Sequence, residues 1–226
     1  EMDQNLRRRL VHYLTLKKNY GFYEFHSSVY FPYTLKGLMN LADFAEDEEI
    51  NELAIAAVRR LLTDNVRFLT IEGAYFPVAG RNQVSKYIGT FVHNHNKVLY
   101  LITGLGPVAD TPSPGSVFFS TSLLDFSDIA LNWEESIDTE ITNGHTMSDA
   151  MILNKNQDFY DQVVFNFSQG GYFHPDVADD TIKWAGEMYG EQYTPDILPE
   201  YDFSKYVPEG FGSLTATIGA TFSRSS

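Results

Sequence analysis

The chain has 226 residues, of which 43% are hydrophobic and 15% aromatic, and its formal net charge is −14. It is long enough for one large domain with a well-packed core, and its charge argues against nucleic acid, because phosphate binding requires clustered Lys and Arg. The absence of cysteine excludes disulfides, thiolate catalysis and cysteine-ligated metals, and no apolar run approaches the roughly 20 residues of a membrane span.

The first part of the chain predicts three amphipathic helices. Residues 1–18 carry apolar side chains at helical spacing, with Lys17 on a solvated face, and a polar, aromatic connection follows. A second helix is expected from Phe31 or Pro32, with proline in its tolerated first-turn position. An acidic run then favours the start of a third helix that ends near Leu69. The second and third helices therefore predict an antiparallel hairpin.

The rest of the chain has weaker patterns. The expected order is a loop over residues 70–84, a helix from 84 to about 103, a proline-rich linker over 104–115, a helix over 116–125, a patternless stretch over 126–157, a short strand or buried segment over 159–167 and a helix over 175–189. The last 35 residues have strand character. We predict a mainly α-helical domain over residues 1–190, followed by an extended or β-rich tail over residues 191–226.

The most characteristic sequence motifs of the chain are the segments Gly21–Tyr30, Leu41–Asp47, Gly73–Tyr75, Gly80–Arg81 and Gly171–Pro175. Together they resemble a group of bacterial α/α-toroid proteins of mostly unassigned activity, which are similar to the helical barrels of polysaccharide lyases and some glycoside hydrolases. The resemblance covers roughly residues 1–190. It implies that the antiparallel helical hairpins form part of an (α/α) toroid.

The toroid that the resemblance implies would be incomplete. A closed toroid of six helix pairs needs about 300 residues, whereas this chain provides about three or four pairs. Glu1 also starts in what reads as the middle of a helix, with no capping residue before it. We therefore expect a fragment or processed product of a longer chain, with the toroid completed by further segments of that chain or by a homo-oligomer.

Two loops of the predicted fold are expected to converge. Residues 19–30 follow the first helix and residues 70–84 follow the third, so both lie at the same end of alternating antiparallel helices. The resemblance implies a sugar-binding cleft in the loops at one end of a helical barrel. The residues brought together are then Glu24, His26, Tyr30, Tyr75 and Arg81.

The first loop supplies the candidate catalytic residues. Tyr30 can take the base or acid role that tyrosine has in lyases, where it removes the proton beside a uronate carboxylate, or it is a core tyrosine. His26 can neutralise that carboxylate or relay a proton, or it is a structural histidine. Glu24 can act as a general acid or base if burial raises its pKa, or it anchors the loop.

The candidate substrate-binding residues lie in both loops. Arg81 suits a substrate carboxylate because its planar fork matches that geometry, and a salt bridge to Glu72 or Asp64 is the alternative. Tyr75 is a sugar-stacking platform or simple packing, and Tyr23 is a further substrate contact.

No metal or cofactor is predicted. His93 and His95 would face one way on a strand, but on the expected helix their side chains point about 200° apart, so they would not share an ion. The acidic stretches at 46–49 and 134–140 lack the alternation and the glycine of a calcium loop. No phosphate loop, nucleophile elbow or dinucleotide fingerprint occurs in the sequence.

These patterns favour an enzyme domain that acts on a polysaccharide, with β-elimination at a uronate ahead of glycoside hydrolysis. Hydrolysis needs two carboxylates at a defined separation, and Glu24 is joined only by the more distant Asp43. The alternatives are a non-catalytic helical scaffold that binds glycan or protein, and an assembly role. A cysteine-free chain suits the cytoplasm as well as bacterial export, so an extracytoplasmic or secreted location is one expectation.

Overall fold

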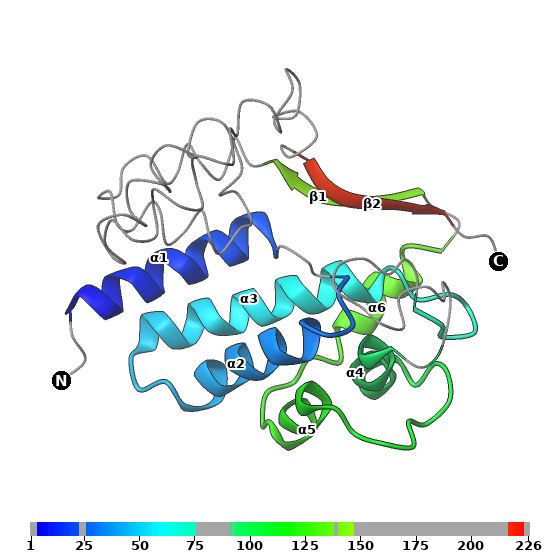
Figure 1. Ribbon diagram of the computed structural model, residues 1–226, viewed down its shortest axis with the longest axis horizontal. Helices are drawn as coiled ribbons and strands as arrows, with labels where there is room; N and C mark the ends of the chain where they lie inside the picture. Colours follow the sequence, from blue (N-terminus) through cyan, green and yellow to red (C-terminus); the bar gives the residue numbers. More distant parts are fainter. Residues whose placement is uncertain are drawn as a thin grey trace, which may run out of the picture. The chain divides into compact units, whose positions relative to one another are not determined.

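The computed structural model describes residues 4–22, 26–75, 91, 93–137, 140–146 and 217–223, and these are mainly helical (Figure 1). The elements are α1 (Gln4–Tyr20), α2 (Phe31–Phe44), α3 (Glu48–Val66), α4 (Asn94–Thr103), α5 (Pro114–Thr121), α6 (Ile129–Glu134), β1 (Glu140–Thr146) and β2 (Thr217–Ser223). The two strands pair with each other in a two-stranded sheet. Of the helices in this described part, none is both long and apolar enough to cross a lipid bilayer.

The predicted hairpin of the second and third helices is confirmed. Helices α2 and α3 lie side by side, and α1 packs along α3 (Figure 1). Asp47 begins α3 because its carboxylate accepts the amide hydrogen of Ile50 at 3.2 Å, which satisfies one of the free donors of the first turn. Arg7 of α1 donates to the same carboxylate at 2.6 Å. The acidic turn thus starts one helix and holds another against it.

The core of the described residues lies between these three helices and the start of α4. It is formed by side chains at three- and four-residue steps, which is the spacing that puts them on one helical face. Its largest fully buried members are Leu14, Phe31, Leu35, Met39, Ile50, Leu61, Leu62, Phe68, Leu69, Tyr75 and Leu99.

The shorter helices cover the hairpin. Helix α5 packs on α2 so closely that a Cβ added to Gly115 would lie 2.9 Å from the Cα of Pro32. Helix α6 packs on α3, where Arg59 pairs with Asp128 at 2.8 Å. The indole of Trp133 donates to the Leu69 carbonyl at 3.1 Å, which fixes the end of α6 near the end of α3.

Several predicted boundaries were wrong. The helix expected from Val84 begins at Asn94, because His93 has extended backbone (φ −71, ψ 148). The helix expected over 116–125 begins two residues earlier, where Ser113 and Ser116 form a capping box ahead of the first-turn proline. The stretch 126–157, predicted to be patternless, contains α6 and β1.

The domain division and the toroid stay predictions. The chain separates into two compact units, Glu1–Asn143 with Ala220–Ser226, and Gly144–Gly219, and the six helices of the described residues belong to the first. Strand β2 falls within the tail predicted over 191–226. The rest of that tail, the segments predicted over 159–167 and 175–189, and the boundary after residue 190 lie outside the described residues.

Replacing Gly37 with alanine is expected to raise the free energy of unfolding by roughly 0.5–1 kcal/mol, because alanine restricts the unfolded chain and favours a helix interior. Gly37 is exposed in the middle of α2, and an added Cβ meets no atom within 4 Å. Urea unfolding of the two proteins measures the difference. An unchanged or lower midpoint would contradict the helical placement of this residue.

Candidate functional site

The two loops that were expected to converge meet at His26 and Tyr75. The imidazole Nδ1 of His26 lies 2.6 Å from the phenol oxygen of Tyr75, although the two residues are 49 positions apart. Tyr75 is brought there by a tight turn in which the backbone amide of Thr70 donates to the carbonyl of Ala74 at 2.8 Å and Leu69 forms a β-bridge with Tyr75. Both side chains are buried, with exposed fractions of 4% for His26 and 0% for Tyr75.

A chain of hydrogen bonds fixes the direction of every proton at this contact. Asn65 donates from its side-chain amide nitrogen to the Leu61 carbonyl at 2.7 Å, and a carbonyl can only accept, so the amide oxygen of Asn65 faces the other way. That oxygen accepts the phenol hydrogen of Tyr75. The phenol has no second hydrogen, so its oxygen accepts from Nδ1–H of His26. The imidazole is therefore the Nδ1-protonated tautomer.

Aromatic contacts surround this hydrogen-bond chain. The ring of Tyr75 stacks on His95 at 4.0 Å between centroids and 3° between planes, and His95 stacks on Phe31 at 4.3 Å. The ring of His26 meets Phe68 edge to face at 4.7 Å. These five rings come from two helices, α2 and α4, and from the loops after α1 and α3.

The beginning of α4 is held over the same cluster. Asn94 donates its backbone amide to the hydroxyl of Ser28 at 3.1 Å and its side-chain amide to the Ser28 carbonyl at 2.7 Å. Asn96 donates to the carbonyl of Gly73 at 2.6 Å. Because both contacts lie within the first turn of α4, they position His95 against Tyr75.

Burial keeps both central groups neutral. Desolvation lowers the pKa of His26 from 6.5 to about 3, since water can no longer solvate the imidazolium. Desolvation also raises the pKa of Tyr75 well above 10, and the negative charge of Asp64 adds to this shift. His26 therefore offers hydrogen bonds and no positive charge, and the ring of Tyr75 has no face open to solvent.

The stability of the protein is expected to fall as the pH drops from about 6.5 toward 3. The pKa of His26 is lower in the folded chain than in the unfolded chain. In this pH window the imidazole therefore binds a proton in the unfolded chain but stays neutral in the folded chain. The slope due to this one group approaches about 1.4 kcal/mol per pH unit.

A His26→Asn variant isolates this effect, because its amide can still donate to Tyr75 but does not titrate. Urea unfolding between pH 7 and 5 should show a shallower pH dependence for the variant than for the unchanged protein. Parallel curves would show that the folded histidine is protonated as easily as the unfolded one.

The other predicted site residues are placed as follows. Tyr30 immediately precedes α2 and is 38% exposed, and its backbone amide donates to the hydroxyl of Ser27 at 3.3 Å. Tyr23, Glu24 and Arg81 lie outside the described residues. Of the three described candidates, the structure thus brings His26 and Tyr75 together in the interior and leaves Tyr30 at the surface.

Two acidic residues considered in the sequence have partners within the helices. Asp64, one of the alternative partners of Arg81, pairs with Arg60 at 2.6 Å. Asp43 accepts the hydroxyl hydrogen of Ser122 at 2.6 Å. His93 and His95 flank the start of α4, and the part of the chain that the structure describes contains no group of three or more side chains arranged to hold a metal ion.

Lys17 was predicted to lie on a solvated face, and this was wrong. Its side chain is 2% exposed, and its amine lies 5.3 Å from the ring centroid of Tyr13 and 5.1 Å from that of Phe22. Burial lowers the pKa of this amine to about 7. The neighbouring Lys18 is the exposed member of the pair.

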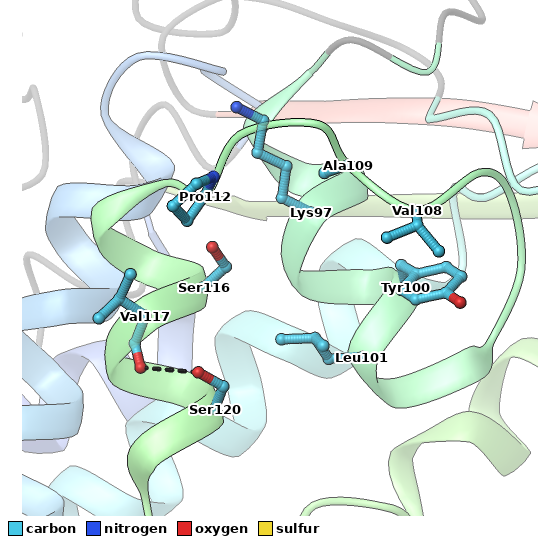
Figure 2. A pocket seen from close by; sticks show the side chains of 9 residues that line it. All are labelled: Lys97, Tyr100, Leu101, Val108, Ala109, Pro112, Ser116, Val117 and Ser120. Carbon is cyan, nitrogen blue, oxygen red and sulfur yellow. Dashed lines mark hydrogen bonds between the residues drawn. The ribbon is translucent and has the colours of Figure 1, made fainter.

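A pocket that the sequence did not predict lies between α4 and α5 (Figure 2). Its volume is about 250 Å³. It is lined by Lys97, Tyr100, Leu101, Val108, Ala109, Pro112, Ser116, Val117 and Ser120. A second hollow of about 570 Å³ lies beside the ends of α2 and α5 and shares Val117 with the first. The only available sequence signal for the first pocket was the three- and four-residue spacing that puts its helical residues on facing sides.

Comparisons of the chain with protein-family models, with curated proteins and with solved structures give no match. The function is therefore inferred from the chemistry of the residues themselves.

Proposed function

We propose that this helical domain acts on a uronate-containing polysaccharide, with β-elimination as its reaction. The observation that supports this proposal is the contact between His26 and Tyr75, through which the loop after α1 meets the loop after α3. The sequence neighbours of these two residues include the candidate acid–base residue Glu24 and the candidate carboxylate binder Arg81.

In the proposed reaction the exposed phenol of Tyr30 serves as the base or the acid. The base takes the proton from the carbon beside the uronate carboxylate, and the electron pair of that C–H bond forms a carbon–carbon double bond. The glycosidic C–O bond on the adjacent carbon breaks, and the acid gives a proton to the departing oxygen. Tyr30 fills one of these two roles and Glu24 fills the other. Arg81 would hold the carboxylate by its guanidinium. His26 is neutral at this depth, so its part in the proposal is to position the loop through Tyr75.

The second candidate function is glycan binding without turnover. The burial of His26 and Tyr75 favours this function. Two neutral, enclosed side chains stabilise the packing of the loops and do not reach a substrate at the surface. In that case the predicted scaffold role, with further segments of a longer protein or a second copy completing the toroid, would describe the domain better than the enzyme role.

The two functions are separated by one experiment. The protein is mixed with alginate, pectin, heparan and chondroitin, and the absorbance of an unsaturated uronate product is followed together with the release of reducing ends. Product with the expected absorbance supports elimination, and reducing ends without it indicate hydrolysis. Binding without either product supports the scaffold, and the absence of binding to all four polymers contradicts both functions.

A pair of variants tests the role of Tyr30. Tyr30→Phe should abolish turnover while leaving the fold intact, because it removes only the hydroxyl oxygen of an exposed ring. Tyr33→Phe removes the same atom from a ring in the first turn of α2 that is 60% exposed, and it should retain full activity. Full turnover by Tyr30→Phe would remove this tyrosine from the mechanism.

A further inference from the structure

The pocket between α4 and α5 gathers exposed apolar side chains. Leu101, Val108 and Val117 are 46%, 70% and 44% exposed, and all three line it. Figure 2 shows Ser116, Val117 and Ser120 on one side and Tyr100 and Leu101 on the other, with Val108 beside the tyrosine ring. Apolar surface that is concave and open to water is typical of ligand sites, whereas single exposed apolar residues are common on any protein.

Among the polar groups that line the pocket, Lys97 is the charged donor available to a ligand. The hydroxyl of Ser116 is used in the capping box with Ser113, and that of Ser120 donates to the Val117 carbonyl at 3.0 Å. Lys97 is the one charged side chain among the described lining residues, and its amine donates to the hydroxyl of Thr111 at 3.3 Å. A partly exposed ammonium held by one long hydrogen bond can turn to meet an anion.

The volume of the pocket suits a small ligand. At 250 Å³ it is close to the lower end, about 300 Å³, of typical ligand pockets, which is enough for one ring with a short substituent. A sugar of this size would bury several hydroxyls, more than the Lys97 amine and the Tyr100 phenol can satisfy, and burying hydroxyls unpaired is unfavourable. The walls therefore select an apolar body, and Lys97 selects a negative charge at its edge.

We propose that this pocket binds a small organic carboxylate with an apolar body, which lies between α4 and α5 while its carboxylate pairs with Lys97. The site is separate from the loops of the proposed polysaccharide function. Either one can therefore fail without affecting the other.

Phenylacetate is a suitable probe, because it has one ring and one carboxylate. Titration of the 226-residue chain, followed by calorimetry and by backbone amide chemical shifts, should show saturable binding with the largest shifts in α4 and α5. Phenylacetamide keeps the ring without the charge, and acetate keeps the charge without the ring. Each should bind at least about tenfold more weakly, which corresponds to about 1.4 kcal/mol.

Three variants test the assignment. Lys97→Met keeps the aliphatic stem without the charge and should weaken phenylacetate binding about tenfold. Lys18→Met makes the same change at an exposed position of α1 and should leave the affinity within about twofold. Ser120→Leu fills the pocket from an exposed position of α5 and should abolish binding, while thermal unfolding shows that the fold is retained.

Three results would overturn the proposal. The first is equal binding of phenylacetate and phenylacetamide, and the second is equal loss of affinity in Lys97→Met and Lys18→Met. No saturable binding of phenylacetate at millimolar concentration would also overturn it.

Discussion

Replacing Tyr75 with phenylalanine is expected to lower the free energy of unfolding by about 2–6 kcal/mol. The substitution keeps the ring that stacks on His95 but removes the hydroxyl that joins two buried groups. The amide oxygen of Asn65 then loses its donor, and Nδ1–H of His26 loses its acceptor. Each group is buried, so water cannot replace the missing partner, and each loss costs about 1–3 kcal/mol.

The matched control for this experiment is Tyr33→Phe. It deletes the same oxygen from a ring that is 60% exposed, so water solvates the site in both states and the expected change is within about 0.5 kcal/mol. Urea unfolding monitored by circular dichroism measures both variants. If Tyr75→Phe were as stable as Tyr33→Phe, the hydrogen-bond chain from Leu61 to His26 would contribute nothing to folding.

The helical hairpin could be predicted because its signals are local. Proline in the first turn of α2, the acidic start of α3 and the apolar residues at three- and four-residue steps all act within one or two helical turns. The start of α4 could not be predicted in the same way. Asn94 begins the helix where Ser28, 66 residues earlier, accepts both its amide groups, and no local pattern encodes such a partner.

In the candidate site, the sequence predicted which loops meet but not which side chains are buried. The meeting of the two loops followed from the alternating direction of the helices, and His26 does contact Tyr75. The sequence did not indicate that Tyr75 would be enclosed and Tyr30 exposed, because both tyrosines stand among aromatic residues. The difference arises from His95, which stacks on Tyr75 from a helix that begins almost 20 residues later in the chain.

Replacing Gly73 with alanine is expected to lower the free energy of unfolding by about 3 kcal/mol or more, which combines a backbone cost and a packing cost. Gly73 has a φ of +82°, a left-handed conformation that L side chains rarely adopt. An added Cβ would also lie under 3.0 Å from backbone atoms of Leu105 and Gly106. Backbone atoms cannot rotate away as a side chain can, so the turn before Tyr75 must separate from the segment after α4.

Gly104→Ala separates the two costs. Gly104 also has a positive φ, +69°, at the end of α4, but an added Cβ meets nothing within 4 Å. It should therefore show only the backbone cost, about 1–2 kcal/mol. Urea unfolding should give a clearly larger loss for Gly73→Ala, and the amide shifts of Asn96 and Tyr75 should change only in that variant, because the Gly73 carbonyl accepts from Asn96. Equal losses in the two variants would mean that residues 73 and 105–106 do not pack in solution as described, and the position of Tyr75 over His95 would then lack its support.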